Sequence, residues 1–186
     1  MLIGLDISTS CTGICLLNDD GSFNSIHHIE LKKEKNFYKK IDMVLDFIDH
    51  IIELKSKVGD VVRFYVEAPL LHFKMKASMA SVLALLQKFN ACVCYGLYLK
   101  YGHEPKLISV ISARKMLGIS IPKKTKKKDS KLMVFNQVKA MNVIPEINWT
   151  YKKTGRPKDF CFDRCDAFVI ARSAYEEENR CQKEKI

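Results

Sequence analysis

Hydrophobic positions along the chain repeat with two different periods, and each period predicts one kind of secondary structure. Short apolar or alternating runs rich in β-branched residues predict five strands, over residues 2–7, 12–17, 23–31, 61–66 and 106–110. Longer stretches with an apolar residue every three or four positions predict helices, over residues 37–57, 74–101, 113–117, 130–141 and 160–178. Polar and turn residues predict loops over residues 122–128 and 144–159.

Polar residues at the ends of these segments support the boundaries. Asn18-Asp19-Asp20-Gly21 is typical of a hairpin turn between the second and third strands. We expect Asn36 to cap the first helix, Ser112 to cap the short third helix, and Asp129 or Ser130 to cap the fourth.

The order of the elements predicts an α/β fold. Three strands joined by short turns form an antiparallel meander, and the strand–helix alternation that follows adds parallel strands, so we expect a mixed sheet with helices on its faces. Neither an internal repeat nor a domain boundary is visible. We therefore expect a single domain over residues 1–178 and a frayed, charged tail over residues 179–186.

The formal net charge of +10 favours a polyanionic partner, either nucleic acid or an anionic membrane, over a basic protein with no such partner. The longest apolar stretches are shorter than the roughly 20 residues of a spanning helix, so no membrane segment is expected. The chain begins with an apolar, strand-like run and has no basic region that would indicate a signal peptide. These features predict a cytoplasmic protein.

The chain has seven cysteines, and their odd number favours reduced thiols. Cys92 and Cys94 are separated by one residue, and Cys161 and Cys165 by three, whereas paired zinc ligands usually have two residues between them. Both pairs sit in apolar, helix-like runs. We therefore interpret them as buried structural cysteines.

Two predicted strands each end in an acidic residue within apolar surroundings. Asp6 follows Leu2-Ile3-Gly4-Leu5, and Glu67 follows Arg63-Phe64-Tyr65-Val66. A buried charge is costly unless it is paired, and ligands commonly bind at the carboxyl ends of parallel strands. We expect these two acids to lie side by side at that edge.

Asp163 and Asp166 lie three residues apart and therefore share one face of the last helix. Acids near a helix N-terminus are also favoured by the helix dipole, so the pair has a purely structural interpretation as well. Four converging carboxylates would repel one another at neutral pH, and hard divalent cations relieve that repulsion. Two such ions would activate water and stabilise the leaving oxygen of a phosphodiester.

Three segments resemble the motifs of the RuvC-like Holliday-junction resolvases, which have an RNase H-like fold. They are residues 4–13 (GLDISTSCTG), 66–69 (VEAP) and 163–171 (DRCDAFVIA). The first motif is shared with sugar kinases and other actin-like ATPases. Those proteins are much longer and need a second glycine-rich phosphate loop, which this chain lacks.

The resemblance implies a homodimeric endonuclease that resolves four-way DNA junctions by paired symmetric nicks. It implies Asp6, Glu67, Asp163 and Asp166 as ligands of two Mg²⁺ ions, which Mn²⁺ can replace, and no organic cofactor. Phe73 occupies the place of an aromatic that probes the junction centre; a core or dimer contact is its alternative role. The basic residues assigned to DNA contact are Lys74, Lys76, Arg114, Lys115, Lys123, Lys124, Lys126, Lys127 and Lys128.

Other interpretations remain open. The lysine run at residues 123–128 also fits a solvated loop or a nuclear address. The same fold could cut flaps, other branched or duplex DNA, or RNA–DNA hybrids. A catalytically inactive scaffold that only binds junctions is a third possibility, and the presence of all four acids argues against it. For a nuclease, the compartment is wherever its DNA substrate is.

Overall fold

The fold is seen in a computed structural model of the chain, which describes residues 1–56, 60–69 and 77–183. The chain forms, in order, β1 (Leu2–Asp6), β2 (Cys11–Leu17), β3 (Phe23–Glu30), α1 (Phe37–Lys55), β4 (Arg63–Glu67), α2 (Ala77–Tyr101), β5 (Lys106–Ile108), α3 (Val110–Met116), α4 (Lys127–Ala140), the 3₁₀ turn η1 (Glu146–Asn148) and α5 (Asp159–Lys183).

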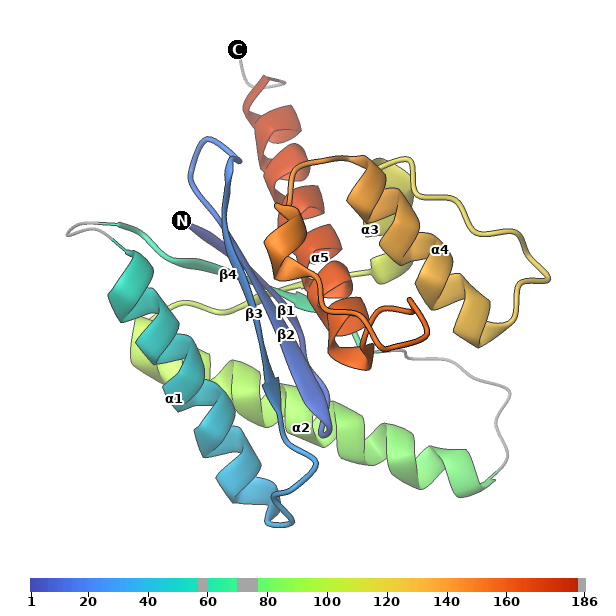
Figure 1. The fold of residues 1–186 in the computed structure, drawn as a ribbon. Helices are drawn as coiled ribbons and strands as arrows, with labels where there is room; N and C mark the ends of the chain where they lie inside the picture. Colours follow the sequence, from blue (N-terminus) through green and yellow to red (C-terminus); the bar gives the residue numbers. More distant parts are fainter. Residues whose placement is uncertain (57–59, 70–76, 184–186) are drawn as a thin grey trace.

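The five strands form one mixed sheet in the order β3-β2-β1-β4-β5. β1, β2 and β3 pair antiparallel, whereas β4 and β5 run parallel to β1. Helices α1 and α2 lie on one face of the sheet, and α3, α4 and α5 lie on the other (Figure 1). The predicted α/β class, with a three-strand meander and added parallel strands, is confirmed.

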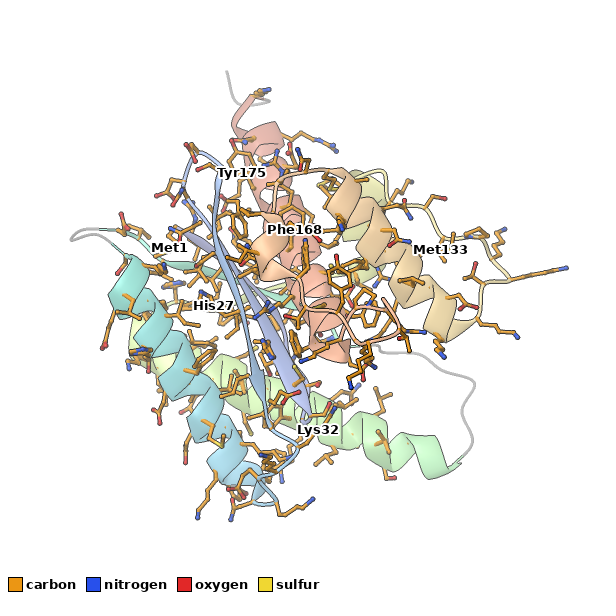
Figure 2. The ribbon with its side chains drawn as sticks, viewed as in Figure 1. Met1, His27, Lys32, Met133, Phe168 and Tyr175 are labelled. Atoms are coloured by element: carbon orange, nitrogen blue, oxygen red, sulfur yellow. The ribbon has the colours of Figure 1, made fainter. Side chains whose placement is uncertain are left out.

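Each face of the sheet has its own hydrophobic core. Because successive side chains along a strand point to opposite faces, neighbouring residues of one strand belong to different cores. In β1, Leu2 joins the core beneath α5, whereas Ile3 and Leu5 join the core beneath α1 and α2. Side chains of the buried centre, such as Phe168, fill the layer between sheet and helices in Figure 2. Because side chains alternate along a strand, Gly4 and Asp6 belong to the α5 side.

Helix α5 packs directly on the centre of the sheet because two glycines allow it to. A Cβ at Gly4 would overlap the backbone of Ala167 and Ala171, and a Cβ at Gly13 would overlap the carbonyl of Asp163. Glycine at both positions therefore lets the helix backbone approach β1 and β2 at a distance that side chains would prevent.

The predicted cap of α1 and the hairpin turn are confirmed. The Asn36 side chain accepts hydrogen bonds from the backbone amides of Tyr38 (2.9 Å) and Lys39 (3.1 Å). Gly21, between β2 and β3, adopts a positive φ of 78°, a conformation that glycine adopts without steric cost.

Two other predicted helix starts are wrong. Ser109, not Ser112, caps α3: its hydroxyl accepts from the Ser112 amide at 3.5 Å, and the earlier start shortens β5 to end at Ile108. Helix α4 begins at Lys127, inside the predicted loop, because the amides of Asp129 and Ser130 both donate to the Lys126 carbonyl at 2.9 Å. Asp129 consequently lies in the first turn, where the helix dipole favours a negative charge.

Helix α5 extends further than its apolar pattern predicts, since it continues past Glu178 to Lys183. The Tyr65 hydroxyl donates to the Glu178 carboxylate, which ties this part of the helix to β4. That the chain forms a single domain with a tail after residue 178 stays a prediction.

Helix α2 changes the expectation about membrane segments. By length and composition alone, Ala80–Tyr101 would be able to cross a membrane, and 22% of the 18-residue window that meets this criterion is buried. The sequence predicts no segment long and apolar enough to span a membrane. By length and composition, α2 is such a segment. One such helix is weak evidence for a span, because core helices of soluble proteins pass the same test.

All seven cysteines are free thiols. Cys161 and Cys165 are buried, as expected, and Cys92 and Cys94 are half-buried. Within the described residues, neither pair belongs to a cluster of three or more potential metal ligands.

Candidate active site

The four acids singled out in the sequence line one cavity, of about 650 Å³, at the ends of β1 and β4, where residues of α2 and α5 also line it. Asp6 and Glu67 come from strand ends, and Asp163 and Asp166 come from the first two turns of α5. The structure thus brings together residues that are far apart in the sequence.

Strand register and alternation explain the position of Asp6 beside Glu67. β1 and β4 are parallel neighbours, with Leu5 opposite Val66, so the next residues along each strand, Asp6 and Glu67, follow side by side. Tyr65 and Glu67 lie on the same face of β4, and Tyr65 packs in the core beneath α5. Both acids therefore belong to the sheet face that α5 covers.

The close packing of α5 explains the position of the other two acids. The backbone of Asp163 lies against Gly13, which is paired with Asp6 across β1 and β2. Asp166, one turn further along, is 7% exposed and faces the same cavity. The two α5 acids are consequently held next to the end of β1.

Two cations neutralise the α5 acids. The Arg114 guanidinium on α3 donates to Asp166 Oδ1 at 2.7 Å, and Lys131 Nζ on α4 lies 3.6 Å from Asp163 Oδ1. Burial lowers the pKa of Lys131, but the carboxylates of Asp163, Asp166 and Asp6 together raise it above the usual lysine value. Lys131 is therefore charged at neutral pH.

Burial and the charges of neighbouring acids raise the pKa values of the two strand-end acids. Burial, and after it the negative charge of Glu67, raises the pKa of Asp6 well above its usual range. Burial and the charge of Asp166 raise the pKa of Glu67 to about 7, against the opposing effect of Arg114. A side-chain hydrogen bond from Asp6 favours the ionised form of Glu67. Both strand-end carboxyl groups therefore hold a proton more readily than exposed acids do.

The chemistry of this donor set fits hard divalent cations, which bind carboxylate oxygens. Burial and nearby negative charges raise the pKa values of Asp6 and Glu67, an effect that a bound cation would relieve, and Asp163 and Asp166 already attract two cationic side chains. As they are arranged, no three Asp, Glu, His or Cys groups of the described residues lie close enough together to hold a metal ion. Ligation by all four acids therefore requires side-chain rotation away from Arg114 and Lys131.

We expect the affinity for divalent cations to increase with pH. Because the pKa of Glu67 is about 7 and that of Asp6 is raised well above its usual range, a cation must displace protons from this pair at pH 6 but fewer at pH 8. Calorimetric titration with Mg²⁺ and Mn²⁺ measures the dissociation constant at each pH. Where binding of the cation displaces one proton, that constant should fall about tenfold for each unit by which the pH rises. Glu67→Gln should weaken this dependence, and a constant affinity from pH 6 to 8 would contradict it.

Lys131 was missed in the sequence, although a signal for it exists. It lies three and four residues before Val134 and Phe135, both buried, and therefore on the apolar face of α4. A lysine on a buried helix face needs a partner, and the acidic cavity supplies one.

The predicted DNA-contacting residues occupy three kinds of position. Phe73, Lys74 and Lys76, and the side chain of Lys127, lie outside the described part of the chain. Arg114 lines the acidic cavity and pairs with Asp166 rather than facing solvent. The remaining residues are exposed around α3 and the start of α4: Lys115, Lys123, Lys124, Lys126 and Lys128.

Comparison with known proteins gives a likeness in structure only. No protein-family model matches the chain, and no curated protein matches it in sequence. Among solved structures, RuvC of Thermus thermophilus is similar both alone and in complex with a Holliday junction substrate, with a TM-score of 0.56 and 11% sequence identity in each case. The match covers 96% of this chain, and 96% of the RuvC chain alone or 94% of it in the complex. The chain therefore has the RuvC-like, RNase H-like fold that its motifs predict.

Proposed function

We propose that this protein is a metal-dependent DNA endonuclease that resolves four-way junctions by paired symmetric nicks. The observation that carries the proposal is the gathering of Asp6, Glu67, Asp163 and Asp166 around one cavity, on a fold shared with RuvC. The net charge of +10 supports a polyanionic substrate, because an acidic site in a basic protein suits a polyanion that is cut at a metal centre.

In this proposal each acid is a metal ligand, and the neighbouring cations hold the substrate. Two bound Mg²⁺ or Mn²⁺ ions would supply charge stabilisation and an activated water for phosphodiester hydrolysis. When Asp163 and Asp166 ligate metal, Lys131 and Arg114 lose their present partners. Both side chains then become available to the oxygens of the phosphate that lies over the acids.

The exposed lysines provide the remaining phosphate contacts. Lys115, Lys123, Lys124, Lys126 and Lys128 are exposed close to α3 and α4, the two helices that carry Arg114 and Lys131. None of these five lysines pairs with an acid of the described residues within 4 Å. They can therefore neutralise phosphates without first breaking an ion pair. The protein would act in whatever compartment holds its DNA.

A symmetric junction requires two active sites, and α2 offers a surface for pairing two subunits. Its exposed large apolar side chains are Val82, Leu85, Tyr95, Tyr98 and Leu99. Exposed apolar side chains gathered on one element commonly mark a contact between proteins. We propose that α2 packs against α2 of a second copy to form a homodimer.

The test is cleavage of a synthetic four-way junction in Mg²⁺, compared with a flap, a linear duplex and an RNA–DNA hybrid of matched length. The proposal expects paired nicks at symmetric positions of the junction and none by Glu67→Gln, which keeps the shape of the side chain. If the protein cut the flap or the hybrid but not the junction, it would be a nuclease with a different substrate, and the junction-resolving part of the proposal would be wrong.

One observation favours a second candidate, a junction-binding protein without catalytic activity. Asp163 and Asp166 are paired with Lys131 and Arg114, and the described carboxylates are not arranged as a metal cluster. Tight junction binding with no cleavage in either Mg²⁺ or Mn²⁺ would establish this candidate.

A further inference from the structure

A second cavity, of about 470 Å³, opens beside the acidic one and continues it. Ser10, Lys131 and Asp163 belong to the walls of both cavities, so the two form one trough. The second cavity adds Lys32, Lys128 and Arg156, which line it together with Phe160 and Phe162. Lys32 lies just past the end of β3 in Figure 2, whereas Arg156 comes from the long segment before α5.

That long segment is an ordered hairpin. Tyr151 and Pro157 form an antiparallel bridge, and the Lys152 amide donates to the Arg156 carbonyl at 2.8 Å. Gly155 closes the turn with a positive φ of 75°. The hairpin and its flank carry four cationic residues, so the backbone holds a basic surface in place: Lys152, Lys153, Arg156 and Lys158.

The Arg156 side chain is held over the second cavity. Its guanidinium lies 5.6 Å from the centre of the Phe162 ring and donates to the Lys128 carbonyl at 3.4 Å. No acid of the described residues lies within 4 Å of the charged groups of Arg156, Lys32 or Lys128.

The acids of the wall are largely engaged elsewhere. Asp159 pairs with Lys152 at 2.9 Å, and Asp163 pairs with Lys131 at 3.6 Å. Glu30 is the remaining acid that lines the cavity. Within the described residues, the cavity wall therefore carries three cations without an acidic partner, Lys32, Lys128 and Arg156, and one unpaired acid, Glu30. This part of the trough has a net positive charge and suits an anionic group.

The aromatic side chains of the cavity are not available for stacking a base. The His28 ring stacks on Phe160, with centroids 3.9 Å apart and an angle of 14° between the planes. The Arg164 guanidinium lies 5.1 Å from the centre of the same ring, and Arg156 covers Phe162. The chemistry that remains exposed is cationic, which suits phosphate oxygens rather than base faces.

We propose that the second cavity binds the sugar–phosphate backbone of the nucleic-acid strand whose scissile phosphodiester lies over the four acids. Lys32, Lys128 and Arg156 contact phosphates on one side of the cut, and the hairpin over residues 151–157 forms the outer wall. The inference deepens the proposed function and rests on it for the position of the cut.

The first test is the salt dependence of binding, measured without divalent cations on a labelled four-way junction and on a duplex of equal length. Each phosphate contact contributes about 0.9 to the slope of log affinity against log salt. The variant Lys32→Ala with Arg156→Gln, which keeps an apolar stem on Phe162, should lower the slope by about 1.8 on both DNAs. The control Lys55→Ala with Lys183→Ala removes the same charge from exposed ends of α1 and α5 and should leave the slope unchanged.

The second test places the contact along the strand. Single methylphosphonate linkages, which lack the phosphate charge, are introduced at each of the positions flanking the nick. Wild-type binding should weaken at positions on one side, and the Lys32→Ala, Arg156→Gln variant should be insensitive at those positions. An equal response of wild type and variant at every position would overturn the inference.

The outcomes separate the two proposals. If the wild type binds DNA but nicks nothing, the proposed function fails, while the slope difference between variant and control still decides the cavity's role. If the wild type nicks junctions and the variant keeps the wild-type slope, only the cavity inference fails.

Discussion

Replacing Asp6 by asparagine should abolish nicking and at the same time stabilise the metal-free protein at pH 8. The loss of activity should reach about 10³-fold, the scale on which a preorganised electrostatic group contributes. The asparagine side chain cannot ionise, but its amide can still donate a hydrogen bond to Glu67, so the site should keep its shape. DNA binding should persist, because the phosphate contacts lie on other residues.

The stability gain follows from the direction of the pKa shifts. Burial raises the pKa of Asp6 and of Glu67, so the folded protein binds more protons than the unfolded chain between their unfolded and folded pKa values. Stability that is present below pH 4 is therefore lost as the pH rises through about 7. We therefore expect Asp6→Asn to be more stable than the wild type at pH 8 and equally stable at pH 4.

Urea denaturation of wild type and Asp6→Asn at pH 4 and pH 8, in EDTA and in Mg²⁺, measures this effect. Mg²⁺ should stabilise the wild type and not the variant, since a ligand stabilises only the state that binds it. Asp46→Asn, an exposed acid on α1, is the matched control and should change neither activity nor stability. A variant that is less stable than wild type at pH 8 would mean that Asp6 has a structural role in place of a metal-binding one.

The strand-borne part of the site could be predicted from the sequence because it depends on local pattern. An acid at the end of an apolar run, found twice, implies two parallel strands that end at the same edge, and the register of β1 and β4 places Asp6 and Glu67 there. The hairpin turn and the Asn36 cap were predictable for the same reason, since each depends on a few adjacent residues.

The cations of the site could not be predicted in the same way, because they depend on packing between distant elements. Arg114 was predicted to contact DNA, and its pairing with Asp166 depends on the packing of α3 on α5. Lys131 lies within the predicted helix, but its contact with Asp163 depends on how α4 packs on α5. Helix starts are hard to predict from sequence where no side chain caps the helix, as at Lys126.

Glycines 4 and 13 were recognised only as part of a family-like motif, and the structure supplies their physical reason. Each removes a Cβ that would meet the backbone of α5, not a flexible side chain. The distance between sheet and helix, and with it the separation of the strand acids from the helix acids, is therefore set by these two positions.

Gly13→Ala should consequently reduce nicking by about 10²-fold, the cost of a displacement of about 1 Å in an active site. The new methyl group overlaps the Asp163 carbonyl, so the first turns of α5 must move away from β2 and carry Asp163 and Asp166 with them. Overpacking of this kind should also lower the free energy of unfolding by about 1–3 kcal/mol.

A matched control separates misplacement of the acids from simple loss of stability. Val44→Ala leaves a cavity in the opposite core, beneath α1, and should destabilise the protein by a similar amount without touching α5. Nicking rates and urea midpoints of both variants, measured at a temperature where both are folded, give the comparison. If Val44→Ala lost as much activity as Gly13→Ala, the contact between β2 and α5 would be needed for stability alone. Full activity in Gly13→Ala would show that the site tolerates a shift of the helix that carries half of its acids.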